Sequence, residues 1–330
     1  MDNLCVILYG DFWDIVCLSA LTNAINSEVK KRLTIITQKK YKKFLELYSS
    51  ANNVIEFDEK NIWKTIEQVE NKKIGKIIDL HNTSFNENKR IERLQFIDPK
   101  KIEILLSKNR FDVVKNSNKN IKIIDTRVIS EKEHQINYYA RRIWYTINEN
   151  IYNSLVIKPQ NQDIQKANQI KKKYERGSKL IGIIPYSLRS HKELPKEKRE
   201  KIVSKIRKMG DQVMVFGSKH ELKTKPIQNV NYETQNIKKI EDYIPYILCC
   251  DEMVSIDTGL KHLSGYMWKK VTSIYWHASP KIRWILGENE IRIESNEGCS
   301  PCNNPFSCKF KKAICMESIN IDRILKNIYI

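Results

Sequence analysis

Short runs of aliphatic and β-branched residues alternate along the chain with longer segments whose polar and apolar positions suit helices. Such unbroken apolar runs are typical of strands that are buried on both faces of a parallel sheet. The runs are 4–9, 33–37, 76–80 and 121–125 in the first half of the chain, and 180–185, 212–216, 252–256 and 271–276 in the second half. The segments between the runs are long enough for crossover helices. The pattern therefore predicts two successive α/β units.

A polar segment, residues 157–177, separates the two series of predicted strands. It contains Pro159 and a lysine-rich helical pattern, and this composition is typical of a domain junction. We predict a first domain over residues 1–165 and a second domain over residues 166–330. A ligand is expected in a cleft between the two domains, outside the carboxyl ends of the strands.

Length and composition exclude several classes of protein. A chain of 330 residues with 41% apolar residues can fill two cores, so it is neither a disordered tail nor a small disulfide scaffold. The sequence has no run of about 18 apolar residues and no leader at its N-terminus, which predicts a cytoplasmic protein. Neither the dinucleotide-binding glycine motif nor a phosphate-binding P-loop occurs, so a nicotinamide dehydrogenase or a P-loop enzyme is disfavoured.

The chain is strongly basic, with a formal net charge of +19. A field of this sign attracts polyanions, which include nucleic acids, anionic membranes and phosphorylated lipids or sugars. The lysines are scattered, however, and a run such as 171–173 is also typical of a solvated helix face. No helix-turn-helix, zinc-finger or aromatic RNA-binding signature accompanies the charge. We therefore expect phosphorylated ligands or a membrane surface and no nucleic-acid partner.

The segment 254–263 combines a predicted strand with a turn into a helix. The free N–H groups at a helix start suit a phosphate, and glycine at Gly259 lets the backbone come close to a ligand. Thr258 adds a hydroxyl donor, and Asp257 can accept hydrogen bonds from sugar hydroxyls. The alternative is an ordinary aspartate cap with His262 packed on the sheet.

Two strand ends of the second domain carry further polar residues. Ser187, Arg189 and Lys192 lie in the loop after its first strand, where a diphosphate would bind. Glu221 follows the next strand, where a carboxylate could bind both hydroxyls of a ribose. The alternative for the loop is a solvated basic segment without a ligand.

Two carboxylates, Asp11 and Asp14, follow the first strand of the first domain. A carboxylate that faces the cleft could remove the proton from an attacking hydroxyl group. The alternative is that both are acids in the first turn of a helix, where the helix dipole favours them.

Together these segments resemble the heptosyltransferases of glycosyltransferase family 9, which have the GT-B architecture of two Rossmann-like domains facing across a cleft. The order and spacing of the similar segments over more than 250 residues carry the resemblance. These segments are Gly10 through Leu21, Ile77 through His81, His134 through Tyr138, Lys192 through Pro195, and Asp257 through Leu263.

The resemblance implies an inverting, single-displacement transfer that needs no catalytic metal and no cofactor. It implies that the first domain binds the acceptor and that the second domain binds the nucleotide sugar. The implied roles are Asp14 as general base, Lys192 and Ser187 as stabilisers of the leaving diphosphate, Glu221 as the ribose contact, and Asp257, Thr258, Gly259 and His262 as the motif that holds sugar and phosphate.

The sequence departs from the family pattern at two of these segments. Trp13 stands where the family usually has a glycine before the aspartate, so Asp11 and Asp14 both remain candidates for the base. Leu194 replaces the tryptophan of the Lys-x-Trp-Pro motif.

Four cysteines, at Cys299, Cys302, Cys308 and Cys315, are spaced closely enough for their thiolates to converge on one metal ion. Similar C-terminal cysteines recur in the family, including the enzymes that heptosylate autotransporter proteins, where an iron-bearing finger is known. We expect zinc or iron in a structural role. The alternative is four reduced thiols in a cytosolic loop.

The sequence thus predicts an enzyme that transfers a heptose, with ADP-heptose as donor, to a lipopolysaccharide-core or related saccharide or glycolipid. Its basic surface would favour peripheral contact with the inner face of the inner membrane. The alternative within the same fold is a heptosyltransferase that modifies serine or threonine of an autotransporter-type protein. The alternative from another class is a non-catalytic basic protein that binds nucleic acid or membrane.

Overall fold

The computed structural model describes residues 3–8, 10–25, 32–58, 61–70, 74–80, 103–107, 121–124, 134–142, 154–173, 178–187, 192–234, 237–285, 288–302, 308–310 and 313–329. Arg189 and His81, two residues of the predicted motifs, lie outside these ranges. The chain divides into two compact units, Met1–Leu155 and Val156–Ile330. The division falls earlier than the predicted boundary after residue 165, because helix α9 (Asn161–Lys171) packs against helix α12 of the second unit.

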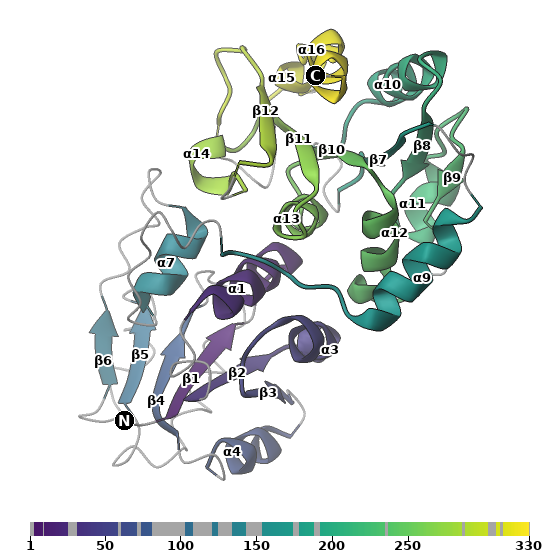
Figure 1. Cartoon of the computed structure of the whole chain (residues 1–330). Helices are drawn as coiled ribbons and strands as arrows, with labels where there is room; N and C mark the ends of the chain where they lie inside the picture. The colour runs from purple at the N-terminus through teal and green to yellow at the C-terminus, as the bar shows by residue number, and fades with distance from the viewer. Residues whose placement is uncertain are drawn as a thin grey trace. The chain divides into compact units, whose positions relative to one another are not determined.

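The first unit contains one six-stranded sheet in the order β3-β2-β1-β4-β5-β6 (Figure 1). Every strand pair is parallel. The strands are β1 (Asn3–Leu8), β2 (Leu33–Thr37), β3 (Asn53–Glu56), β4 (Ile74–Asp79), β5 (Glu103–Ser107) and β6 (Ile121–Ile124). The described helices are α1 (Phe12–Ala24), α3 (Lys39–Tyr48), α4 (Ile62–Glu70) and α7 (Gln135–Arg142). This strand order is that of the Rossmann fold, in which the winding reverses between the first and fourth strands.

The second unit repeats the arrangement, with the order β12-β11-β10-β7-β8-β9 and parallel pairing throughout. Its strands are β7 (Leu180–Ile184), β8 (Gln212–Val215), β9 (Tyr232–Glu233), β10 (Glu252–Ile256), β11 (Lys270–Tyr275) and β12 (Glu290–Glu294). Its helices are α9, α10 (Lys196–Lys208), α11 (Lys219–Thr224), the 3₁₀ helix η3 (Ile240–Tyr243), α12 (Ile244–Cys249), α13 (Gly259–Tyr266), α14 (Pro280–Arg283), α15 (Ile314–Glu317) and α16 (Ile321–Ile328). The winding reverses between β7 and β10.

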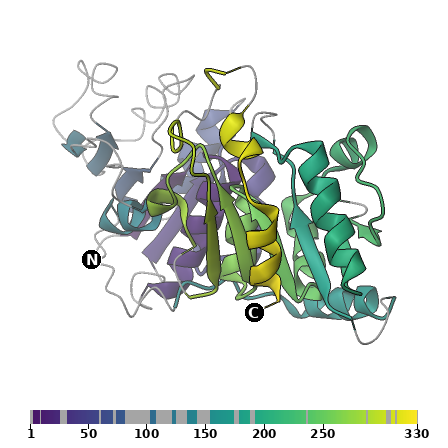
Figure 2. The same cartoon turned by 90° about the horizontal axis from the view of Figure 1, so that it is seen from above.

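The end of the chain is built into the second unit. Helix α16 packs against α10 and against strands β11 and β12, and Figure 2 shows it lying along these elements. Ile324 and Ile328 of α16 are fully buried in the same apolar cluster as Val254 and Ile256 of β10. The segment that carries the four cysteines is therefore held at both ends by one core.

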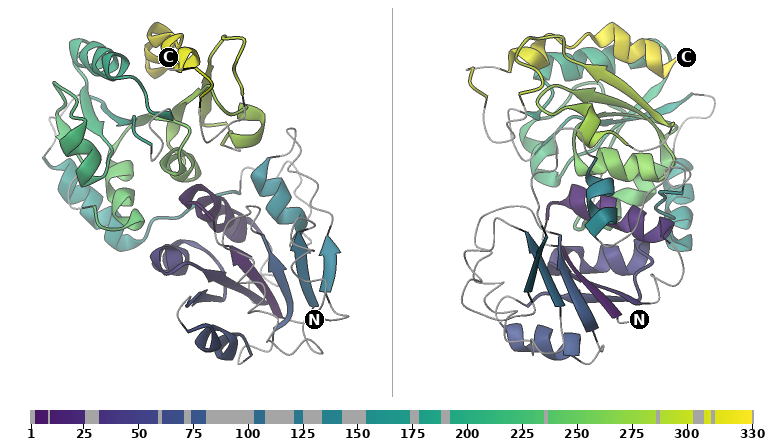
Figure 3. Two further views of the ribbon diagram at one scale, coloured as in Figure 1. Left: turned by 180° about the vertical axis from the view of Figure 1, so that it is seen from behind. Right: turned by 90° about the vertical axis from the view of Figure 1, so that its left-hand side faces the viewer.

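The two Rossmann-like units confirm the predicted α/β class, and all eight predicted strands are present. Four further strands, β3, β5, β9 and β12, escaped prediction. Three of them, β3, β9 and β12, are edge strands with one open side (Figure 3). Their sequences carry more polar residues than those of the central strands. Strand β12, for example, has the alternating sequence EIRIE, in which only Ile293 is buried.

Within the part of the chain that the structure describes, no helix combines the length and the hydrophobicity that a membrane crossing needs.

Candidate active site

The polar residues singled out in the sequence follow the strands at which the winding of each sheet reverses. Asp11 and Asp14 follow β1, Ser187 follows β7, and Asp257 follows β10. Since all strands within a sheet are parallel, these residues lie at the carboxyl edge of their own sheet, where open α/β sheets bind ligands.

Asp11 and Asp14 form the start of helix α1. Asp11 is the exposed N-cap residue, and its backbone N–H donates to Oδ2 of Asp14 over 2.9 Å. Asp14 therefore has the capping role that the sequence left open. A carboxylate oxygen has two lone pairs, so an oxygen that accepts this hydrogen bond can also accept a proton.

Gly10 makes room for the Asp14 carboxylate. A Cβ atom at this position would lie 2.4 Å from Oδ2 and 2.8 Å from Cβ of Asp14. The carboxylate folds back over the turn, and any side chain larger than hydrogen would push it away. The position of Asp14 thus depends on glycine at residue 10.

Tyr139 of helix α7 holds the other oxygen of Asp14. Its hydroxyl group donates to Oδ1 over 2.6 Å, and the tyrosine side chain is buried where α7 packs against α1. Sequence reasoning missed this residue, because hydrophobic periodicity does not show which helices meet. The one signal was the family-like segment His134 through Tyr138, which ends one residue before it.

Asp257 lies at the centre of a buried charged cluster in the second unit. Lys261 Nζ lies 3.0 Å and His262 Nε2 3.8 Å from its Oδ1 atom, while Arg283 Nη1 lies 3.5 Å and His277 Nε2 3.9 Å from Oδ2. Burial by itself raises the pKa of Asp257, but Lys261, followed by His262, Arg283 and His277, holds this pKa well below its ordinary value. Asp257 is therefore an ionised carboxylate.

Two buried oxygen atoms at this strand end make no hydrogen bond among the described residues: Oδ2 of Asp257 and Oγ1 of Thr258. Oδ2 has only the longer contacts with Arg283 and His277 given above. Thr258 is the N-cap residue of α13, and Gly259 begins the helix. The first N–H groups of a helix have no partner within the helix, so this turn presents both donors and acceptors to a ligand.

His262 is completely buried, and its ring lies 6.3 Å from that of Tyr266, centroid to centroid. Its Nε2 atom lies on the Oδ1 side of Asp257. This burial fits the interpretation that His262 packs on the sheet, and we expect it to act on a ligand only through Asp257.

Glu193 joins two described segments near the end of β7. Lys225 Nζ donates to both oxygens of Glu193, over 2.7 and 2.8 Å, and the Ser187 N–H approaches Oε1 of Glu193 at 3.5 Å. Lys192 is only 7% exposed, and Leu194 fills the core in place of the family tryptophan. The Leu194 N–H also donates to the backbone oxygen of Pro185 over 3.1 Å, so both described flanks of the loop lie together at the end of β7.

Glu221 is the third residue of helix α11. Its Oε2 atom accepts from the Ser218 N–H over 2.8 Å, and the Ser218 hydroxyl accepts from the Glu221 N–H over 3.3 Å. This reciprocal cap engages one carboxylate oxygen and leaves Oε1 for the predicted ribose contact.

Residues 131–313 match the family model of glycosyltransferase family 9 (heptosyltransferase), which is more than half of the chain. The chain belongs to this family. The match includes every predicted site residue of the second unit except Cys315. It therefore assigns heptosyl transfer to a protein whose strand ends carry the polar residues described above.

Solved structures with the same fold include other family 9 enzymes. A family 9 glycosyltransferase from Veillonella parvula DSM 2008 has 13% identity and a TM-score of 0.72 over 99% of this chain and 96% of its own. ADP-heptose lipopolysaccharide heptosyltransferase II from E. coli has 13% identity and a TM-score of 0.73 over 99% and 97%. At these identities the likeness shows the fold alone, and it confirms the GT-B architecture.

A third structure with this fold is the iron-containing dodecameric glycosyltransferase TibC from enterotoxigenic E. coli H10407. It has 9% identity and a TM-score of 0.61, and the match covers 99% of this chain and 75% of TibC. Comparison with the sequences of curated proteins finds no match.

The four C-terminal cysteines of this glycosyltransferase differ in their surroundings. Cys315 is buried, and burial together with Cys299 and Cys308 raises the pKa of its thiol to about 11. Cys302 is exposed, and its Sγ atom lies 3.9 Å from the backbone oxygen of His277. Among the described residues, no group of three or more cysteine, histidine or acidic side chains is arranged to hold a metal ion. The predicted metal site therefore stays a prediction.

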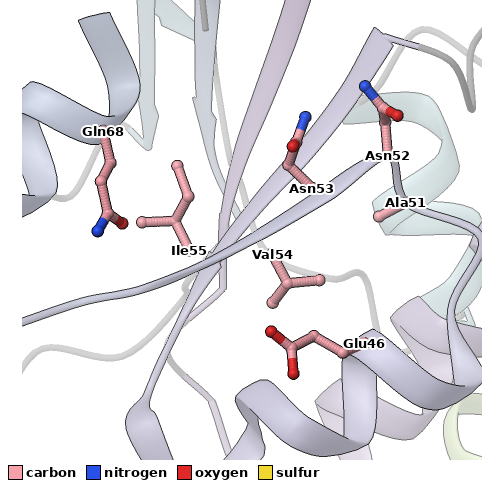
Figure 4. Close-up of a pocket in the computed structure, with 7 residues that line it drawn as sticks. All are labelled: Glu46, Ala51, Asn52, Asn53, Val54, Ile55 and Gln68. Carbon is pink, nitrogen blue, oxygen red and sulfur yellow. The ribbon is translucent and has the colours of Figure 1, made fainter. Parts of the chain in front are cut away.

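The glycosyltransferase also has a pocket of about 600 Å³ in its first unit (Figure 4). It is lined by Glu46, Ala51, Asn52, Asn53, Val54, Ile55 and Gln68. Most of these residues belong to the turn before β3 and to β3 itself, so the pocket begins at the amino end of that edge strand. It contains none of the predicted site residues.

The contact between Tyr139 and Asp14 predicts that Tyr139→Phe lowers the turnover number of heptosyl transfer by about tenfold. A hydrogen bond to a charged group is worth about 1.5–3 kcal/mol, and without it the carboxylate can rotate away from the acceptor. Steady-state kinetics would measure the loss. Tyr232→Phe, which removes a tyrosine hydroxyl hydrogen bond at the edge strand β9, is the matched control. An unchanged turnover number in Tyr139→Phe would show that this contact plays no part in transfer.

Proposed function

We propose that this protein transfers a heptose from ADP-heptose to a saccharide acceptor, with inversion at the anomeric carbon and without a catalytic metal. The observation that carries the proposal is the family 9 match together with the ionised Asp257 beside the start of α13. Two relatives support the donor: E. coli heptosyltransferase II is an ADP-heptose enzyme, and TibC forms a complex with ADP-D-β-D-heptose.

The second unit supplies the groups that would bind this donor. The backbone N–H groups at Thr258 and Gly259, with Lys192 and Ser187, provide positive charge and donors for the diphosphate. Oδ2 of Asp257 is an acceptor for a sugar hydroxyl. The Oε1 atom of Glu221 is an acceptor for the ribose.

The first unit supplies the proposed general base. Asp14 removes the proton from the acceptor hydroxyl, whose oxygen then attacks the anomeric carbon of the heptose. The bond between that carbon and the diphosphate oxygen breaks, and ADP leaves with the bonding electrons. Negative charge grows on the diphosphate, where Lys192 stabilises it. We favour Asp14 over Asp11, because two hydrogen bonds orient Asp14 whereas Asp11 is an exposed cap.

The acceptor that we propose is a lipopolysaccharide-core or related surface saccharide. The net charge of +19 would favour peripheral contact with an anionic membrane that carries such a glycolipid. The second candidate acceptor is serine or threonine of an autotransporter-type protein. Two observations favour testing it: this chain has the fold of TibC, and it carries four C-terminal cysteines. Incubation of the enzyme and ADP-heptose with each acceptor class, followed by mass spectrometry, distinguishes the two.

Asp14→Asn is expected to abolish transfer while donor binding stays within a few-fold of that of the wild type. The base acts on the acceptor and makes no contact with the nucleotide, and asparagine can still cap α1. Transfer assays and calorimetric titration with ADP measure the two effects. Full loss in Asp11→Asn with activity retained in Asp14→Asn would move the base to Asp11. Full activity in both variants would contradict the proposed base.

Transfer should persist when a chelator removes divalent cations from the assay, since Lys192 and the start of α13 supply the positive charge that the leaving diphosphate needs. The measurement is the rate of ADP release with and without EDTA, with added magnesium as the comparison. A strict requirement for magnesium would overturn the proposed leaving-group site.

Lys192→Ala should lower the affinity for ADP-heptose and should also lower the turnover number by about 30-fold or more. The charge that Lys192 meets is larger in the transition state than in the bound donor, and one such contact is typically worth about 2–4 kcal/mol. Lys192→Arg should rescue part of the loss. Lys196→Ala changes an exposed lysine of the neighbouring helix and serves as control. A loss of affinity with unchanged turnover would remove Lys192 from the transition state.

We also propose that the cysteine segment binds about one zinc or iron ion per chain in a structural role. Cys302→Ser combined with Cys308→Ser should then remove the metal and lower the melting temperature, because metal binding contributes folding free energy. Elemental analysis of anaerobically purified protein and thermal unfolding measure these effects. Cys250→Ser, outside the segment, should keep the metal. Wild-type protein without stoichiometric metal would leave four ordinary thiols.

A further inference from the structure

Lys261 is completely enclosed in the second unit, one turn along α13 from Asp257. Its ammonium group has three donors, and each has an acceptor. Nζ lies 3.0 Å from Oδ1 of Asp257, 2.6 Å from the Tyr275 hydroxyl group and 2.6 Å from the backbone oxygen of Arg283. The ammonium position is therefore fixed from three directions.

Tyr275 extends this network to strand β12. Its hydroxyl group accepts from Lys261 and lies 2.6 Å from Oε1 of Glu290, while Oε2 of Glu290 accepts from the Ile285 N–H over 2.9 Å. Burial, followed by the charges of Glu290 and Asp257, raises the pKa of Tyr275 well above its ordinary value, so it remains a donor to Glu290. The network thus joins α13, β11, β12 and the segment after α14 around one lysine.

The two oxygen atoms of Asp257 have different surroundings. Oδ1 accepts from Lys261, whereas Oδ2 is buried and makes no hydrogen bond among the described residues, its nearest cationic group being Arg283 Nη1 at 3.5 Å. Buried acceptors in native proteins almost always have a hydrogen-bond donor, so Oδ2, next to the start of a helix, is suited to accept a hydrogen bond from a ligand hydroxyl group.

A structural role alone does not explain a charged group in this place. A fully buried ammonium group carries a large desolvation cost, and a hydrophobic side chain of similar volume usually stabilises a fold at least as well. Lys261 also stands at a position that the Asp-Thr-Gly-x-x-His pattern leaves variable. The motif therefore does not assign it a role.

We propose that Lys261 is a positioning residue of the donor site, which holds the Asp257 carboxylate in the orientation that presents Oδ2 to a hydroxyl group of the nucleotide sugar. This inference rests on the proposed function. Lys261 itself, being enclosed, does not touch the donor. Because its cation holds Asp257 ionised, it also sets the pH range over which Oδ2 is an anionic acceptor.

The first experiment uses Lys261→Met, which keeps the length of the side chain and removes its charge. We expect kcat/KM for ADP-heptose to fall about tenfold or more at neutral pH, with a smaller fall in kcat. The acid limb of the pH profile of kcat/KM should move to higher pH. The groups that face Asp257 from the surrounding elements are His262, His277 and Arg283. Of these groups only His262 lies on the Oδ1 side, at 3.8 Å, which is farther than the 3.0 Å of Lys261 Nζ.

A second variant tests whether Lys261 acts through Asp257. In an Asp257→Asn background the loss caused by Lys261→Met should largely disappear, because no carboxylate remains to be held. A loss of equal size in both backgrounds would overturn the proposal. Lys269→Met is the matched control, since this partly buried lysine caps the backbone oxygens of Leu248 and Cys250 away from Asp257. It should lower stability without moving the pH profile.

A third measurement needs no sugar. In the wild type the lowered pKa of Asp257 contributes stability above the pKa of the unfolded chain, and this contribution is lost as pH falls through the folded pKa. In Lys261→Met the buried carboxylate loses its main cation and its pKa rises, so the unfolding free energy should fall, relative to wild type, as pH rises through the pKa range between the wild type and the variant. Lys261→Met combined with Asp257→Asn should not show this slope. If Lys261→Met does not fold, Tyr275→Phe should shift the kinetic profile in the same direction by a smaller amount.

The outcomes separate the two proposals. If the wild-type protein neither binds nor uses ADP-heptose, the proposed donor is wrong. The pH dependence of unfolding would still test whether Lys261 holds Asp257 ionised. Wild-type activity with an unchanged profile and an unchanged kcat/KM in Lys261→Met would overturn the role of Lys261 alone.

Discussion

Parallel pairing is the constraint on which the rest of this structure depends. Strands that run in one direction bring all their carboxyl ends to one edge of a sheet, and the reversal of winding between β1 and β4, and between β7 and β10, opens that edge for a ligand. Residues far apart in sequence, such as Ser187 and Asp257, therefore follow adjacent strands. In each unit the sheet is the scaffold, and a few residues in the turns after its strands supply the candidate chemistry.

The two units use their carboxylates in different ways. Asp14 is partly buried and is oriented by neutral donors, the Asp11 N–H and the Tyr139 hydroxyl group. Asp257 is enclosed and is surrounded by Lys261, Arg283 and two histidines. A proton acceptor needs a modest environment of this first kind, whereas a permanent anion needs the second. The difference in surroundings supports the difference in proposed role.

The sequence was sufficient to predict most of the central strands and the two-unit fold, because these depend on local hydrophobic runs, and its short motifs directed attention to the turns that carry the candidate site. It could not predict edge strands such as β12, in which charged residues alternate with two isoleucines and no unbroken apolar run occurs. Tyr139 and the contacts of Lys261 were also beyond reach. Both depend on which side chains meet after folding, and Lys261 looks in sequence like any other lysine of a basic chain.

Asp14 combines two tasks in one side chain. Its Oδ2 atom caps α1, a helix whose residues from Ile15 to Thr22 are all buried, and the same carboxylate is the proposed base. Loss of the aspartate would therefore weaken the fold of the first unit even in a descendant that no longer transfers sugar. Selection for folding alone favours aspartate here, or an asparagine that caps α1 in its place. An aspartate at this position in a related sequence is consequently poor evidence, on its own, that the relative is still an active enzyme.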